Sequence, residues 1–173
     1  PHFEKMLYDQ AGLLALYADA AADTGDFTTV VGETVTYLTR DLMDASGAFY
    51  AAEDADSEGR EGTFYVWTRA QLDAALGSEE AARFARAYNV TDEGNFEDEA
   101  TGERTGENVL FLDAWPSDGA ADERSLGVLR EARERRPRPL LDDKILTDWN
   151  GLAVSALAYA GEKLDEPAYV DLA

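Results

Sequence analysis

Apolar residues recur at helical spacing along most of this sequence, and this period constrains the fold more than any other feature. They form one helix face over about residues 3–22, which ends near Gly25, and another over about 28–43. Further helical segments are predicted at about 68–76, 78–88, 122–135, 147–163 and 166–173. Successive helices joined by short loops pack as antiparallel pairs. The sequence therefore predicts a mostly α protein with polar motifs in loops at one end.

Local signals define some helix starts and one β segment. Thr68 and Gln71 form a capping box at the start of a short helix, and Thr147 is expected to cap a later one. Residues 47–52 and 63–67 alternate in polarity on either side of an acidic loop that contains glycine. This pattern predicts two short strands that form a β-hairpin.

The charge of the chain is extreme, with 36 acidic and 15 basic side chains, a formal net charge of −21 and a pI near 4.1. Nucleic acid binding needs the opposite sign, and an anionic membrane surface repels such a chain, so neither partner is expected. Diffuse acidity is typical of proteins from a high-salt cytoplasm, where it keeps the surface hydrated. We therefore interpret the chain as a halophilic, cytoplasmic protein.

Length and composition indicate a globular protein. The chain has 173 residues, of which 45% are hydrophobic, and this is enough for a domain with a core. No segment reaches the roughly 18 consecutive apolar residues of a membrane span. The absence of cysteine excludes disulfides, thiolate metal sites and thiol catalysis within these residues.

Both ends of the chain interrupt a helical pattern. Pro1 leads directly into a helix, and residues 166–173 stop while still apolar. We expect residues 1–173 to be one fragment, truncated at both ends, that lacks the remainder of its own polypeptide. Such a fragment would expose the alanine and leucine face of the helix at about 148–163 or bury it by self-association.

Three short stretches that mix ionisable groups with aromatic side chains are the candidate functional regions. They are PHFEKMLYDQ at the start, EDADSEGREGTFYVW at 53–67 and DDKILTDWNGL at 142–152. Such groups beside an apolar pattern are typical of a pocket wall. We expect the three stretches to converge on one polar cavity, in which Lys5 or Lys144 pairs with an acid from another stretch. The leading acids are Asp54, Asp56, Asp142 and Asp143, and Tyr65 or Trp67 is expected to form a wall.

The first stretch contains the only histidine, His2, so a histidine metal cluster is excluded. His2 is chemically suited to general acid–base catalysis, and the alternative is a capping or packing role. His2, Lys5 and Asp9 follow the spacing i, i+3, i+7, so a helix would place them along one edge.

The second stretch begins like a calcium loop, with carboxylates and a glycine at the expected positions in DADSEG at 54–59. Tyr65 stands where that loop needs a glutamate, so no bound metal is expected. The carboxylates instead suit hydrogen bonds from sugar hydroxyls, with Phe64, Tyr65 and Trp67 as flat faces for a sugar ring. The alternative is a solvated acidic hairpin.

The third stretch places two aspartates side by side. Asp142 and Asp143 repel each other unless a cation is near, and Lys144 supplies one positive charge. A second partner, such as Lys5 or a ligand, would neutralise the other carboxylate. The alternative is that these acids only stabilise the N-terminus of the following helix.

Four stretches in this order, PHFEKMLYDQA, AAEDADSEGREGTFYVW, YNVTDEGNFE and RPRPLLDDKILTDWNGLAVSALA, resemble the thioredoxin-domain-containing, spermatogenesis-associated-protein-20-like (YyaL-type) family over nearly the whole chain. The resemblance implies part of an (α/α)6 toroid, similar to N-acylglucosamine 2-epimerases, cellobiose 2-epimerases and six-hairpin glycosidases, with a short β-hairpin. It also implies an N-terminal thioredoxin-like domain in the parent protein, outside these residues. It implies no particular substrate.

The resemblance implies site residues in all three stretches, because motif loops line the central cavity of such toroids. The catalytic candidates are His2, Glu4, Asp54 and Asp143. The substrate-binding candidates are Lys5, Tyr8, Asp9, Glu53, Asp56, Glu58, Tyr65, Trp67, Asp142, Lys144, Trp149 and Asn150. A single histidine departs from the two-histidine arrangement of the sugar epimerases, so a second one would come from the missing hairpins.

Two functions from different classes follow. In the first, the parent is a carbohydrate-active enzyme, similar to an epimerase, isomerase or glycosidase, that binds a carbohydrate or polyol without a cofactor, and the fragment alone is inactive. In the second, the chain is a non-catalytic binding or regulatory module that acts with the thioredoxin-like domain on protein clients. A cavity lined by acids, one lysine and aromatics favours the first, and a filled cavity with acids paired on the outside favours the second.

The net charge predicts a stability that depends on salt. Screening relieves the repulsion among acids, so the melting temperature should rise clearly from low to molar potassium chloride. The rise should level off once the Debye length falls to a few ångströms. Thermal unfolding followed by circular dichroism measures it, and a flat curve would remove the high-salt interpretation.

Overall fold

A computed structural model describes residues 2–98, 101–113 and 123–173 of the chain. The chain forms two compact units. Unit 1 contains residues 1–55 and 140–173, and unit 2 contains residues 56–139. Each unit has its own hydrophobic cluster, so each is described by itself.

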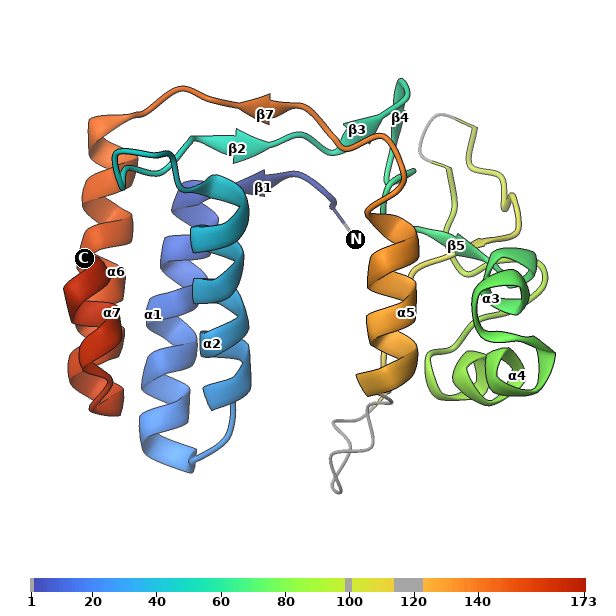
Figure 1. Ribbon diagram of the computed structural model, residues 1–173, viewed down its shortest axis with the longest axis horizontal. Coiled ribbons are helices and arrows are strands. Elements are labelled where there is room, and N and C mark those ends of the chain that lie inside the picture. The colour runs from blue at the N-terminus through green and yellow to red at the C-terminus, as the bar shows by residue number, and fades with distance from the viewer. Residues whose placement is uncertain (1, 99–100, 114–122) are drawn as a thin grey trace. The chain divides into compact units, whose positions relative to one another are not determined.

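Unit 1 is built from helices that run side by side (Figure 1). They are α1 (Leu7–Thr24), α2 (Thr28–Tyr37) with its π-helical continuation η1 (Leu38–Leu42), α6 (Thr147–Leu164) and α7 (Pro167–Leu172). Helix α1 packs mainly on α6 and also on α2, while α7 folds back on α6. A Cβ added at Gly161 would lie 2.6 Å from Val170 Cγ2, so glycine permits the close approach of α7 to α6. The core includes Leu7, Leu14, Val31, Leu38, Leu42 and Leu157.

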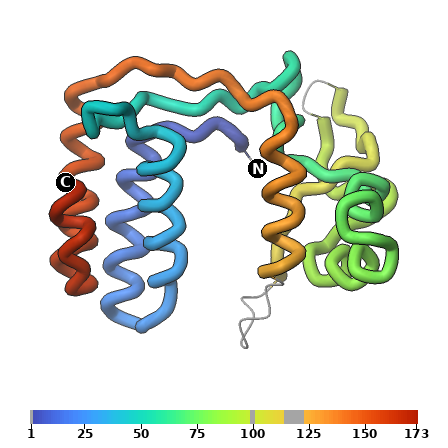
Figure 2. Tube along the Cα trace, in the orientation of Figure 1, coloured from blue at the N-terminus to red at the C-terminus, as the bar shows by residue number. Residues whose placement is uncertain are grey.

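A small antiparallel sheet crosses one end of these helices. It consists of β1 (Lys5–Met6), β2 (Ala52–Glu53) and β7 (Leu141–Asp142), in the order β1-β2-β7. Lys5 is opposite Glu53, and Ala52 is opposite Asp142. The trace in Figure 2 shows how three segments distant in sequence come side by side here.

Unit 2 combines short helices with two small strand pairs. Its elements are β3 (Asp56–Ser57), β4 (Arg60–Glu61), β5 (Trp67–Thr68), α3 (Arg69–Leu76), α4 (Ser78–Ala87), β6 (Glu107–Asn108) and α5 (Glu123–Arg133). Strand β3 pairs with β4, and β5 pairs with β6. Helix α3 packs against both α4 and α5. Its core includes Trp67, Leu72, Ala81, Phe84, Tyr88 and Leu129.

The mostly α architecture is confirmed, and the helix boundaries other than the start of α1 agree closely with the sequence pattern. The capping box of Thr68 and Gln71 is present, and Gly25 ends α1 in the left-handed conformation with its N–H bonded to Ala21 O. Helix α1 begins at Leu7 instead of about residue 3, because Lys5–Met6 pairs with β2 as a strand.

Two expectations about local structure are wrong. Thr147 is the first residue of α6, and the N-cap, Leu146, makes no side-chain capping bond. The alanine residues of this helix, which were expected to be exposed or covered by self-association, are instead buried inside unit 1, whereas Leu152 is 52% exposed, as expected. Its buried residues are Ala153, Ala156, Leu157, Ala160 and Gly161.

The predicted hairpin of residues 47–52 and 63–67 is also wrong. The first segment contributes β2 to the sheet of unit 1, and the second contributes β5, which pairs with β6. The only turn of hairpin type between them joins β3 to β4 through Glu58 and Gly59, both with positive φ. Alternation in a sequence marks a half-buried strand but does not specify its partner.

The side chain of Asn108 links several irregular segments of unit 2 by hydrogen bonds. Its side chain is fully buried, and its Oδ1 accepts hydrogen bonds from the backbone N–H groups of Thr91 and Asn95. Its Nδ2 donates to the carbonyls of Trp67, Thr91 and Gly106. A buried amide with all its groups satisfied holds irregular backbone in a single conformation.

Arg136 joins the segment after α5 to the aromatic stretch. Its Nη1 donates to the carbonyls of Thr63, Phe64 and Val66, at 3.3, 2.9 and 2.8 Å. The guanidinium carbon lies 4.0 Å from the centre of the Trp67 ring. Burial lowers the pKa of Arg136, the charge of Arg133 lowers it further, and Glu107 raises it in part.

The planar guanidinium is therefore expected to be required at this position. Arg136→Lys keeps the charge but loses the planar group that stacks on Trp67 and the Nη1 donor that it holds beside three carbonyls, so it should lower the free energy of unfolding by about 1–2 kcal/mol. Arg135→Lys, at an exposed neighbour, should change it by less than about 0.5 kcal/mol. Urea unfolding of both variants tests this, and equal effects would contradict a specific role for Arg136.

Candidate functional site

The three candidate stretches meet in part at the sheet of unit 1, which we call the motif sheet and define as β1, β2 and β7 with their adjoining residues 2–9, 54 and 140–150. Twelve of the sixteen candidate residues lie in unit 1. They are His2, Glu4, Lys5, Tyr8, Asp9, Glu53, Asp54, Asp142, Asp143, Lys144, Trp149 and Asn150. The other four, Asp56, Glu58, Tyr65 and Trp67, lie in unit 2.

A charged pair joins the first stretch to the second at the centre of the motif sheet. Lys5 Nζ lies 3.7 Å from Glu53 Oε1, and the Glu53 side chain is only 4% exposed. Lys5 Nζ also donates to the carbonyl of Phe3 at 2.6 Å. The prediction that Lys5 or Lys144 pairs with an acid of another stretch is confirmed, although the partner is Glu53 and not one of the four leading acids.

The other lysine pairs within its own stretch. Lys144 Nζ donates to Asp142 Oδ2 at 2.8 Å, and its backbone N–H donates to Asp142 Oδ1. The side-chain hydrogen bond from Lys144 holds the pKa of Asp142 below its ordinary value. The Lys144 side chain is 69% exposed, so this pair is solvated, unlike the pair of Lys5 and Glu53.

The four catalytic candidates have solvent-accessible positions around the motif sheet. His2 Nε2 lies 3.6 Å from Glu4 Oε2, and both side chains are exposed. Asp143 is exposed next to β7, while Asp54 is half-buried and its backbone N–H donates to Leu140 O. A histidine beside a carboxylate is suited to general acid–base catalysis.

Aromatic side chains lie where α1 and α6 begin. The rings of Tyr8 and Trp149 are 4.9 Å apart in an edge-to-face arrangement. Tyr8 also lines a groove of about 620 Å³ between α1 and α6, which extends to Asp19 and Tyr159. The Tyr159 hydroxyl donates to Asp19 Oδ1 at 2.5 Å, and Lys163 Nζ lies 3.2 Å from the same oxygen. The lining of the groove is thus mostly apolar, with the rings of Tyr8 and Tyr159 and the carboxylate of Asp19 among alanine, glycine and leucine residues.

Asn150 has a structural role that explains it without a ligand. Its Oδ1 accepts from the backbone N–H of Phe49, and its Nδ2 donates to the carbonyls of Phe49 and Leu146. These bonds fix the segment before β2 to the start of α6. The amide therefore positions the motif sheet.

The four candidates in unit 2 differ in environment. Asp56 and Glu58 are exposed on the β3–β4 hairpin, whereas Trp67 is 5% exposed and has Arg136 over one face. Tyr65 is half-buried, with its ring 5.0 Å from that of Phe64 and an arginine, Arg133, at 5.5 Å. These aromatic faces already pack against protein groups.

Sequence reasoning missed two polar clusters. Asp19, Tyr159 and Lys163 come together only because α1 packs on α6, and no local spacing indicates this. Arg60 and Glu107 form a bidentate ion pair at 2.5 and 2.6 Å, which lowers the pKa of Glu107. Among the residues that the structure describes, no three His, Asp or Glu side chains form a group able to hold a metal ion.

Comparison with known proteins identifies relatives along nearly the whole chain. Spermatogenesis-associated protein 20 of Rattus norvegicus is 36% identical over 195 residues, which is 95% of this chain and 25% of the relative. The Homo sapiens protein of the same name is 35% identical over 204 residues, covering 100% of this chain and 26% of the relative. The chain is homologous to spermatogenesis-associated protein 20. This supports the family resemblance found in the motifs.

The relatives extend beyond mammals. An uncharacterised protein of Caenorhabditis elegans is 33% identical over 204 residues, covering 100% of this chain and 28% of the relative. The chain therefore spans about a quarter of the length of these curated relatives. No family model matches the chain. Within the described ranges, every helix is too short or too polar to cross a membrane.

The buried pair of Lys5 and Glu53 is expected to contribute more to the free energy of unfolding than the exposed pair of Lys144 and Asp142. Lys5→Met leaves the Glu53 carboxylate buried beside an apolar side chain, so it should lower the free energy of unfolding by about 2 kcal/mol. Lys144→Met removes the solvated pair and should cost less than about 0.5 kcal/mol. Denaturant unfolding compares the two variants.

A double variant separates the charge effect from local packing. Lys5→Met with Glu53→Gln removes both charges and should recover part of the loss seen in Lys5→Met. Additive losses would show that the two side chains act independently, against the pairing described above.

Proposed function

We propose that the chain forms part of a carbohydrate- or polyol-binding region in proteins of the spermatogenesis-associated-protein-20-like family. The observation that carries this proposal is the convergence of the three stretches in the motif sheet, next to the groove that Tyr8 lines. Carboxylates and amines bind sugar hydroxyls, and an aromatic face packs against the C–H groups of a sugar ring. The parent fold under this proposal is an (α/α)6 toroid.

The catalytic form of the proposal is an epimerase- or isomerase-like reaction. Such a reaction removes a proton from a carbon of the sugar and returns one to the same or a neighbouring carbon, so no net oxidant or reductant is consumed. His2 would act as the acid or base with Glu4 3.6 Å away, and Asp54 and Asp143 are the other candidates. A second catalytic histidine would come from another part of the parent.

A second candidate is a non-catalytic module that acts with a thioredoxin-like domain on protein clients. It is favoured by the number of candidate groups already engaged by the protein itself. Asn150 bonds only to backbone, Lys144 pairs with Asp142, and Trp67 lies under Arg136. In this case the ionisable and aromatic groups of the stretches would serve folding, and self-association or client binding would use exposed apolar side chains such as Leu152.

A thermal shift experiment with a panel of sugars decides between the two. The panel contains N-acetylglucosamine, N-acetylmannosamine, glucose, mannose, cellobiose and inositol. A ligand that binds only the native chain at ten times its Kd should stabilise it by about 1.4 kcal/mol, or raise the melting temperature by about 4 °C. The binding proposal expects such a rise for at least one sugar.

Two matched variants test whether the sugar binds at the motif sheet. Asp54→Asn, in the motif sheet, should abolish the sugar-induced rise while the melting temperature without ligand changes little. Asp23→Asn, an exposed acid in the last turn of α1, should keep the rise. No rise with any sugar at about 100 mM would reject binding by this chain and leave the second candidate.

A further inference from the structure

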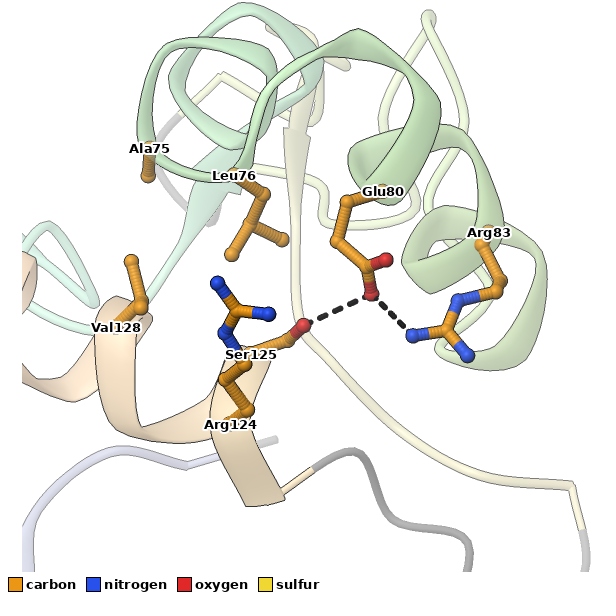
Figure 3. Close-up of a pocket in the computed structure, with 7 residues that line it drawn as sticks. All are labelled: Ala75, Leu76, Glu80, Arg83, Arg124, Ser125 and Val128. Atoms are coloured by element: carbon orange, nitrogen blue, oxygen red, sulfur yellow. Dashed lines mark hydrogen bonds and ion pairs between the residues drawn. The ribbon is translucent and has the colours of Figure 1, made fainter.

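Unit 2 contains a pocket that has no part in the functions proposed above. It has a volume of about 310 Å³ and lies between α3, α4 and α5 (Figure 3). Small-molecule sites in proteins begin at roughly this size. Its walls are formed by Leu76, Glu80, Arg83, Arg124, Ser125 and Val128.

Three of these residues form a fixed polar network. Glu80 Oε1 accepts a hydrogen bond from Ser125 Oγ at 2.9 Å and another from Arg83 Nη2 at 2.6 Å. Ser125 is only 3% exposed, so the network is anchored in the protein interior. The charge of Glu80 is compensated by Arg83, and neither is left to attract an ion strongly.

Arg124 is an exposed residue that adds a second arginine to the pocket lining, beside the pair of Glu80 and Arg83. Figure 3 shows its side chain extending from α5 toward α3, beside Leu76. Within residues 2–98, 101–113 and 123–173, the Arg124 guanidinium makes no hydrogen bond or ion pair, in contrast to Arg83. It belongs to segment 123–139, which carries six arginines and three glutamates in a chain of net charge −21.

The remaining walls are apolar. Leu76 and Val128 face the pocket from α3 and α5, and Val128 is 36% exposed. A ligand complementary to this arrangement has one negative charge for Arg124 and a short aliphatic part for these two side chains. A planar carboxylate matches the donor fork of a guanidinium in a bidentate arrangement.

We propose that this pocket binds a small aliphatic carboxylate, with its carboxylate on Arg124 and its hydrocarbon part against Leu76 and Val128. The site is independent of the motif sheet and of the proposed carbohydrate function. A ligand of so few atoms should bind with a Kd on the order of millimolar.

Titration of the chain with hexanoate, followed by ¹H–¹⁵N NMR, tests this site. Saturable shifts are expected for amides of α3, α4 and α5. Hexanamide has the same size without the charge and should bind at least about tenfold more weakly, because charged hydrogen bonds contribute more than neutral ones. Equal binding of hexanoate and hexanamide would overturn the proposal, and so would the absence of saturation up to about 50 mM.

Two variants test whether hexanoate binding depends on Arg124. Arg124→Gln should weaken hexanoate binding by about tenfold or more, whereas Arg130→Gln, an exposed arginine of the same helix outside the pocket, should leave it unchanged. The spectra themselves show whether each variant is folded. Inorganic phosphate is the last probe, and if it binds through Arg124 as tightly as hexanoate, the aliphatic carboxylate is the wrong ligand class.

Discussion

The ion pair between Lys5 and Glu53 joins the start of the chain to the middle strand of the motif sheet. A carboxylate with a 4% exposed side chain is costly to bury, and the ammonium of Lys5 beside it reduces that cost. The pair spans the register of β1 and β2, so a shift of one residue in that pairing would separate the charges. One electrostatic contact therefore specifies how the start of the chain meets a segment almost 50 residues later.

A second polar group, the side-chain amide of Asn150, fixes the motif sheet to the start of α6. Asn150 bonds to both backbone groups of Phe49, whose ring is buried in the core of unit 1. The charged pair sets the register, and the amide sets the distance between the sheet and α6. Together they keep ionisable groups at fixed places on strands of only two residues, which would otherwise be too short to be stable by themselves.

Local patterns in the sequence were sufficient for the helices but not for the strand partners. The capping box at Thr68 and the end of α1 at Gly25 depend on neighbours within a few residues, so both could be predicted. The partners of β2 and β5 depend on segments far along the chain, which alternation cannot identify. For the candidate site, charge reasoning predicted that Lys5 or Lys144 would pair with an acid of another stretch, but it could not choose between the two lysines or select Glu53. No local pattern in the sequence indicates the contact of Arg136 with Trp67.

Lysine and arginine are distributed unequally between the two units, and this matters for chemical labelling. Lys5, Lys144 and Lys163, the only lysines, all belong to unit 1, while every arginine except Arg40 belongs to unit 2. Reagents that modify the primary amines of lysine will therefore label unit 1 alone, and reagents for guanidinium groups will label mainly unit 2. The chain carries a built-in chemical distinction between its halves, so each unit can be followed separately without introducing a foreign residue.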